Sequence, residues 1–159
     1  MRSLIAIGAL LACASSAAAH TPPDLPPDAS LDQLRAWVDQ HVHKRTFVET
    51  SLDTRRLMLF DPTTLEKLPN GNVVGWFRTE LFQPTVVQGK TVRSVHKKLE
   101  IDCRELRYKE LVEVLHGAPN LGNPAYPVAP SDKWGEARDP NSTSGISMRR
   151  ACEDPKLIR

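Results

Sequence analysis

Two cysteines, Cys103 and Cys152, carry the clearest chemistry in this chain of 159 residues. They belong to no Cys-x-x-Cys motif and to no Cys/His cluster with the spacing of a metal site. In an oxidising compartment two such thiols form a disulfide. Closing a loop of about fifty residues would stabilise the fold by roughly 4 kcal/mol. We therefore predict that they form a structural disulfide and that neither is a catalytic or metal-binding thiol.

The other residues able to do chemistry form no recognisable site. His41 and His43 would lie about 200° apart on a helix, so one helix face could not present both to a metal ion. No nearby carboxylate or thiol clearly completes a site around them. The sequence contains no Gly-x-Ser-x-Gly nucleophile motif, no glycine-rich phosphate loop and no pair of carboxylates in a catalytic setting. It thus predicts a non-enzymatic protein without a metal or a cofactor.

Six basic residues surround Cys103: Arg93, Lys97, Lys98, Arg104, Arg107 and Lys109. Two interpretations stay open. The residues form a solvated strand face and turn, or a contact surface for an acidic or glycosylated protein partner, which positive charge would attract. Because strand side chains alternate, Lys97 and Lys98 cannot both lie on the open face, and we assign Lys98 to it. The candidate partner-binding residues are therefore Arg93, Lys98, Arg104 and Arg107.

The N-terminus has the order of a secretory signal peptide over residues 1–19: a basic Arg2, a short apolar run and three final alanines. The apolar run is too short to span a bilayer, and no later segment is long and apolar enough to do so. Cys13 follows a Leu-Leu-Ala sequence that resembles a lipobox. Two processing routes therefore stay open, cleavage after Ala19 and lipidation of Cys13. Both export the mature protein to the periplasm or the cell surface, and its sole membrane attachment would be a lipid anchor.

The length of the mature chain predicts a single domain. Removal of the signal leaves roughly 140 residues, enough for a single core. The net charge of +2 is small, and acidic and basic residues are interspersed. This balance argues against nucleic-acid binding and against a cationic helix on a membrane surface. Prolines crowd residues 20–29, which we interpret as an extended leader, and residues 30–159 form the predicted domain.

The first element predicted in the mature chain is a helix. Ser30 and Gln33 have the spacing of a capping box. Apolar residues then recur at helical spacing, which predicts an amphipathic helix from Leu31 to His43. These residues are Leu31, Leu34, Val38 and Val42.

Short strands are predicted after the helix, over residues 46–52, 55–60 and 73–82, with a turn at Pro69–Asn72. In the third strand we place Arg78 and Glu80 on a polar face, opposite the apolar face that carries Phe77. Trp76 and Phe82 share the less apolar face, where they would either anchor a partner or pack under the N-terminal helix.

The clearest strand spans Lys90–Cys103, where alternation indicates an antiparallel sheet with one solvated side. The residues predicted to face the core are Val95, Leu99, Ile101 and Cys103. Residues 106–115 fit both a helical stripe and a strand, and their local propensity favours helix. A second helix is predicted within Asn141–Asp154.

Four segments, in this order, resemble the surface-adhesin E-like family of bacterial envelope proteins over residues 47–152. They are Leu59–Leu65 with its Asp-Pro turn, Gly71–Phe77 with Trp76 after a run of valines, Arg93–Cys103 leading into the first cysteine, and Trp134 before Cys152. The N-terminal helix and the proline-rich leader are departures from the family pattern.

The resemblance implies an α+β fold: a single antiparallel β-sheet of about six strands with a C-terminal helix tethered by the disulfide, plus the N-terminal amphipathic helix of this chain. It also implies a strand over residues 106–115, which we adopt against the local propensity. The implied function is adhesion to host matrix or surface proteins. The alternative is a periplasmic accessory or structural protein of an envelope or secretion complex, since fold alone does not fix function. The sequence leaves the partner and the oligomeric state open.

Overall fold

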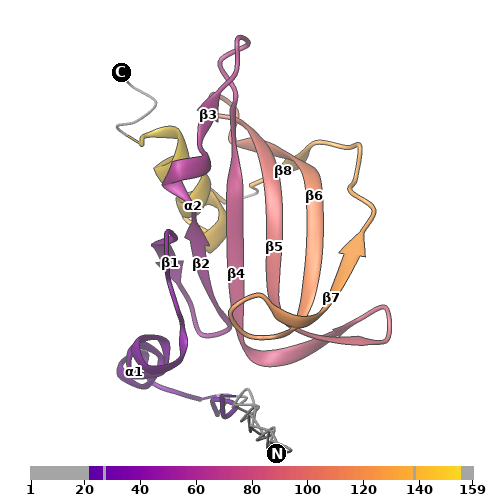
Figure 1. Cartoon of the computed structure of the whole chain (residues 1–159). Coiled ribbons are helices and arrows are strands. Elements are labelled where there is room, and N and C mark those ends of the chain that lie inside the picture. Colours follow the sequence, from indigo (N-terminus) through magenta and orange to yellow (C-terminus); the bar gives the residue numbers. More distant parts are fainter. Residues whose placement is uncertain (1–21, 27, 138, 155–159) are drawn as a thin grey trace, which may run out of the picture.

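The computed structural model describes residues 22–26, 28–137 and 139–154. The predicted signal peptide, the lipidation candidate Cys13 and the first two residues of the leader lie outside the described residues. The described chain forms one curved antiparallel sheet, with one helix before it in the sequence and one after it (Figure 1). This arrangement agrees with the predicted α+β class.

Helix α1 (Leu31–His41) begins with the predicted capping box. The Gln33 N–H donates to Ser30 Oγ at 3.3 Å, and the Ser30 N–H donates to Gln33 Oε1 at 2.7 Å. The helix ends at His41, with Val42 as its C-cap, two residues before the approximate end predicted from the sequence. The Asn120 side chain donates to the His41 carbonyl at 2.8 Å and accepts from the His43 N–H at 2.7 Å. These bonds satisfy backbone groups that a longer helix would have paired internally.

The sheet has eight strands, more than the predicted six or so. They are β1 (Val48–Leu52), β2 (Arg56–Phe60), β3 (Glu66–Lys67), β4 (Val73–Val87), β5 (Lys90–Asp102), β6 (Arg107–Ala118), β7 (Gly122–Val128) and β8 (Gly135–Glu136). Six of them form the continuous order β1-β2-β4-β5-β6-β7, all antiparallel. The other two have two residues each and extend the edges of β4 and β6. Segments this short have no detectable alternation in sequence.

Strand β6 confirms the strand implied for residues 106–115, and a bulge explains the helical spacing there. Lys98 pairs with Val112, but the next residue of β5, Leu99, pairs with Glu110, so one residue of β6 is unpaired. The extra residue reverses the alternation along β6. Apolar residues on the two sides of the bulge therefore recur at irregular intervals, which in the sequence resemble a helical stripe.

One face of the sheet, the α2 face, packs against helix α2 (Thr143–Cys152). Its core cluster combines residues of β2, β4 and β5 with Leu65, which precedes β3, and with two residues of the helix: Phe60, Leu65, Val73, Phe77, Leu99, Ile101, Met148 and Ala151. The Cys103–Cys152 disulfide lies beside this cluster with an S–S distance of 2.03 Å. It joins the residue after β5 to the last residue of α2, which confirms the predicted disulfide and the tethered helix.

The opposite face, the α1 face, packs against α1 over only part of its area. Its core cluster is Leu34, Trp37, Val38, Val42, Leu57, Leu59 and Phe82. The rings of Trp37 and Phe82 meet edge to face, with centroids 5.5 Å apart. Phe82 therefore packs under the N-terminal helix, one of the two roles that its position in the sequence left open.

Val95 departs from the predicted core. Leu99 and Ile101 are buried as predicted, whereas Val95 is half-buried and lies outside the cluster. All three lie on the α2 face, because Val95 pairs with Thr79, Leu99 with Gly75 and Ile101 with Val73. Alternation specifies the face on which a side chain lies, but not how far a helix covers that face.

Replacing Leu99 by alanine should lower the free energy of unfolding by about 3 kcal/mol, because it leaves a cavity in the core. Replacing Val95 by alanine should lower the free energy of unfolding by about 1 kcal/mol, since this side chain is already partly in water. Urea unfolding followed by circular dichroism measures both. Equal losses for the two variants would contradict the assignment of the core.

Loss of the disulfide should destabilise the protein through the unfolded state. The bridge spans a sequence separation of 49 residues, and opening a loop of that size should cost about 4 kcal/mol. We expect this loss in urea unfolding of the Cys103→Ser/Cys152→Ser double variant. Dithiothreitol should destabilise the unmodified protein and leave the double variant unchanged, and an equal response of both proteins would refute the assignment.

Candidate functional site

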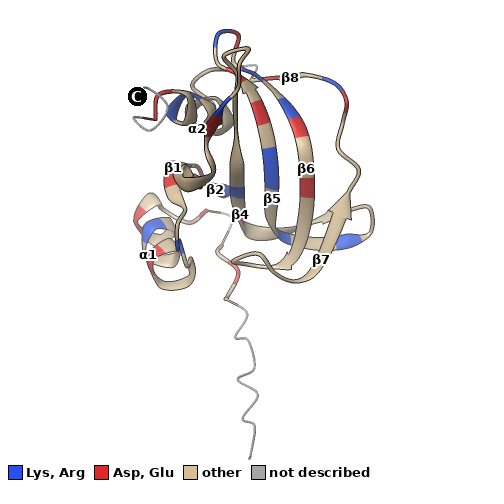
Figure 2. Cartoon of the chain, turned by 45° about the horizontal axis from the view of Figure 1, so that its top comes forward, with Lys and Arg blue, Asp and Glu red and all other residues tan. Residues whose placement is uncertain are grey.

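The four basic residues predicted to contact a partner are spread along the sheet, and acidic residues are interspersed with them on β5 and β6 (Figure 2). Arg93 forms an ion pair with Asp24 of the leader, which leaves its side chain 12% exposed. Arg104 is exposed in the turn between β5 and β6, after the Asp102 that ends β5. The structure thus separates Arg93 from Arg104.

Lys98 and Arg107 share the α1 face. Lys98 and Asp102 lie on the same side of β5, and Asp102 pairs with Arg107 across the strands. Arg107 donates to the Asp102 carboxylate at 2.8 Å. Hydrogen bonding by Arg107 lowers the pKa of Asp102. Lys98 makes no ion pair within the described part of the chain.

Lys97 points to the opposite side from Lys98, as alternation predicts. It lies on the α2 face, where it forms ion pairs with Glu110 and, at 2.9 Å, with Glu113. Burial alone would lower the pKa of Lys97, but hydrogen bonds and charges from the two glutamates outweigh it and raise the pKa. The Lys97 ammonium is therefore neutralised within the fold, and Lys98 is the lysine of this pair with an unpaired charge.

Lys98 has an aromatic and an apolar neighbour across the strands. Across three neighbouring strands the register places Trp76 beside Lys98 and Lys98 beside Val112. Val112 is 37% exposed, and Trp134 at the edge of the sheet is 40% exposed. The Arg107 guanidinium lies 5.6 Å from the centre of the Trp134 ring. We call these five residues (Trp76, Lys98, Val112, Arg107 and Trp134) the open face.

Neighbouring aromatic side chains on the same face hold the Trp76 ring in place. The Trp76 ring stacks on His96 with centroids 4.1 Å apart, and His96 meets the ring of Phe47 at 5.9 Å. The backbone of Trp76 is fixed by the segment after β2, since its N–H donates to Thr64 Oγ1 at 3.0 Å and its carbonyl accepts from Asp61 at 2.9 Å. A ring held in this way loses little conformational entropy when a partner binds.

A buried polar network underlies the other half of the α1 face. Arg78 and Glu80 are 2% and 0% exposed, and Arg78 Nε donates to Glu80 Oε1 at 2.6 Å. Arg78 also donates to the His43 carbonyl at 2.8 Å and to Asn120 Oδ1 at 2.6 Å. The Asn120 N–H in turn donates to both Glu80 oxygens at 3.1 Å.

Arg78 and Glu80 lie on the face opposite Phe77, as predicted, and both are buried there. The face was assigned correctly, but the segment after α1 and the β6–β7 loop cover it at this level. The one signal in the sequence is that two opposite charges occur two residues apart in a strand otherwise rich in large apolar residues. Asn120 gave no signal, because its partners are distant in the sequence.

Electrostatics around the stacked ring favour a neutral imidazole. Burial, followed by the positive charges of His116 and Arg78, lowers the pKa of His96 to about 4. Burial also lowers the pKa of His116, and its ring Nδ1 lies 3.2 Å from the Gly122 carbonyl oxygen. At neutral pH the positive charge of the open face therefore comes from Lys98 and Arg107.

The described residues contain no group of three or more His, Cys, Asp and Glu side chains arranged to hold a metal ion. His41 contacts the ring of Trp37 with centroids 5.3 Å apart, and His43 is exposed. Among the described residues, neither helix has the length and apolarity needed to span a membrane.

Comparison with known proteins gives a similarity of fold. No family model and no curated protein sequence matches the chain. Two crystal structures of Haemophilus influenzae protein E resemble it, each at 10% sequence identity over 69% of this chain. The structure of crystal form II aligns over 89% of its own length with a TM-score of 0.54, and the other aligns over 86% with a TM-score of 0.52. At this identity the likeness establishes a distant relationship of fold and leaves membership of a family unassigned.

The pKa of His96 should make stability depend on pH. In the folded protein this pKa is lowered from 6.5 to about 4, so the unfolded chain binds a proton more readily. The resulting stability is complete above about pH 6.5 and is lost as the pH falls towards 4. Because the ring is only half-buried, we expect a loss of about 1–2 kcal/mol.

Replacing His96 by phenylalanine keeps a ring against Trp76 and removes the titration. Urea unfolding between pH 7 and pH 4 should show a smaller loss of stability for this variant than for the unmodified protein. His43→Phe, which removes an exposed histidine, is the matched control and should follow the unmodified protein. Identical pH profiles for all three proteins would contradict the assignment.

Proposed function

We propose that this chain is an exported bacterial envelope protein that binds another protein through the open face and catalyses no reaction. Three observations support the proposal. The fold contains a disulfide of the kind that persists outside the cytoplasm. The fold is similar to that of Haemophilus influenzae protein E. Four sequence segments resemble the surface-adhesin E-like family, which favours an adhesin-like role with a host matrix or surface protein as the partner.

The observation that carries the proposal is the composition of the open face. Trp76, Lys98 and Val112 form one row across three strands, and Trp134 and Arg107 lie against each other further along the strands, next to the β5–β6 turn. Tryptophan and arginine are enriched among residues that contribute most to protein interfaces. A partly exposed tryptophan with its ring already held in place is suited to serve as an anchor.

Charge suggests the kind of surface that would fit. Lys98 has no ion pair among the described residues, whereas Arg107 shares its charge with Asp102. The proposed partner therefore presents an acidic group near Lys98 and an apolar group near Val112 and Trp76. Such a charge would act mainly on the rate of association and would be screened by salt.

The test is surface plasmon resonance of the purified protein against a panel of extracellular-matrix proteins and against proteins extracted from the cell envelope. Lys98→Glu should slow association with the partner by about tenfold at low salt, and added salt should mimic this loss. Trp134→Ala should speed dissociation, because it removes an apolar contact and not a charge. Both variants should unfold at nearly the temperature of the unmodified protein, because Lys98 has no ion pair among the described residues to lose and Trp134 lies outside both core clusters.

Lys67→Glu is the matched control, since it reverses the charge of an exposed lysine in β3, paired with Val73 of the other face. It should bind like the unmodified protein. A partner that binds all variants equally, independently of salt, would show that another surface is used. Binding to an envelope protein and to no matrix protein would favour the accessory role over adhesion.

A further inference from the structure

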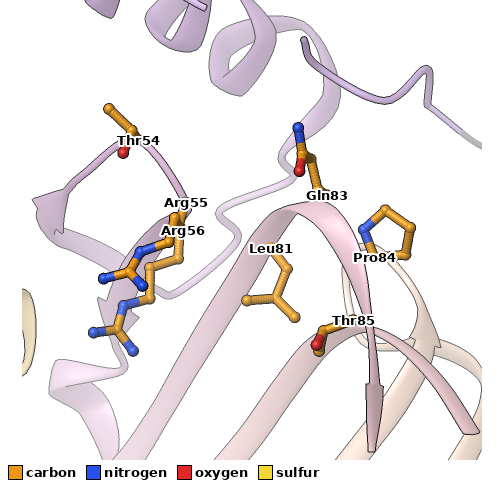
Figure 3. A pocket seen from close by; sticks show the side chains of 7 residues that line it. All are labelled: Thr54, Arg55, Arg56, Leu81, Gln83, Pro84 and Thr85. Carbon is orange, nitrogen blue, oxygen red and sulfur yellow. The ribbon is translucent and has the colours of Figure 1, made fainter. Parts of the chain in front are cut away.

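A second feature, remote from the open face, is a cavity of about 510 Å³ between the β1–β2 turn and the end of β4. Its lining residues are Thr54, Arg55, Arg56, Leu81, Gln83, Pro84 and Thr85 (Figure 3). The volume lies in the range of pockets that bind small molecules. Five of the seven lining residues are polar, and two of these are adjacent arginines, which favour a negatively charged ligand.

The local backbone brings the two arginines to one side of the turn. Asp53 Oδ1 accepts hydrogen bonds from the N–H groups of Arg55 at 2.7 Å and Arg56 at 3.0 Å, which tightens the turn before β2. In a regular strand, two successive side chains would point to opposite faces. Here both arginine side chains line the same cavity (Figure 3).

The fold neutralises this pair of charges only in part. Arg56 Nε lies 3.5 Å from Asp53 Oδ2, which makes an ion pair. Nε is buried and has no hydrogen-bond partner. The same Asp53 oxygen accepts from Thr143 Oγ1 at 2.7 Å, so part of its capacity is already used. The Arg55 guanidinium makes no ion pair or hydrogen bond within the described part of the chain. The cavity is therefore lined by two guanidinium groups with unused N–H donors, and the Asp53 carboxylate beside Arg56 is already engaged.

We propose that this cavity binds the oxyanion group of a carboxylated or sulfated small molecule through Arg55 and Arg56. A guanidinium presents parallel N–H donors that match the oxygens of a carboxylate or a sulfate. The hydroxyls of Thr54 and Thr85 can bond to neighbouring polar groups of such a ligand. Leu81 provides an apolar wall.

The experiment is an NMR titration of the isotopically labelled protein with sodium glucuronate, sodium sulfate and glucose at constant ionic strength. Glucose is the neutral counterpart of glucuronate. We expect both anions to shift the backbone amide signals of residues 53–56 and of Leu81, Gln83 and Thr85, and glucose to leave them unchanged. Shifts with glucuronate alone would also support the site and restrict it to carboxylated ligands.

Substitutions assign the binding to the two arginines. Arg55→Gln and Arg56→Gln should each weaken glucuronate binding about tenfold or more, because each removes charged hydrogen bonds. Arg104→Gln, which removes an equal charge in the β5–β6 turn at the far end of the sheet, is the matched control and should bind normally. Arg55 is exposed, so Arg55→Gln decides the question if the Arg56 variant unfolds.

Absence of shifts with both anions, or equal affinity of Arg55→Gln and the unmodified protein, would overturn the proposal. The cavity and the open face are independent. Lys98→Glu should leave glucuronate binding unchanged, and Arg55→Gln should leave binding to the protein partner unchanged. Failure of one proposal can therefore be distinguished from failure of the other.

Discussion

The buried ion pair between Arg78 and Glu80 is the interaction on which the rest of the α1 face depends. Two charges removed from water are costly unless each is paired and hydrogen-bonded. Here Glu80 accepts from Arg78 and from the Asn120 N–H, while Arg78 also donates to the His43 carbonyl. These partners come from the segment after α1 and from the β6–β7 loop. The pair is therefore satisfied only when both segments cover this half of the sheet.

The same constraint decides which part of the sheet stays accessible. The network ends α1 at His41, because Asn120 takes over the carbonyl there. The next level of β4 carries Trp76, which rests on His96 and is only partly covered. On the other side of the sheet the disulfide holds α2 over β1 and β2. The open face and the cavity at Arg55 and Arg56 lie outside the parts of the sheet that the two helices cover.

Local signals in the sequence were sufficient where a structure depends on neighbouring residues. The capping box at Ser30, the alternation of β5 up to Ile101 and the cysteine count each describe a short segment or a single bond, and the structure confirms them. The strand at residues 107–118 needed the family resemblance, because the bulge opposite Lys98 and Leu99 disguises its alternation.

Long-range contacts explain the rest. Arg93 looked like a free cation but pairs with Asp24, 69 residues earlier in the chain. The partners that bury Arg78 could not be predicted, because neither His43 nor Asn120 is near it in the sequence. Arg55 and Arg56 were within an expected strand, where successive side chains diverge, and only the hydrogen bonds of Asp53 bring them to one side. Burial of charge in this chain is set by partners that no local pattern contains.

The charge at the centre of the open face follows from these contacts. Lys97 is neutralised by two glutamates on the α2 face, Arg107 is paired with Asp102, and the lowered pKa of His96 keeps its ring neutral at pH 7. Lys98 makes no ion pair within the described residues, and its neighbours across the strands are Trp76 and Val112. The charge of Lys98 would orient a bound partner through electrostatics, and burial of the Trp76 ring against that partner would contribute to the binding affinity. The surface can therefore be selective although the net charge of the protein is only +2.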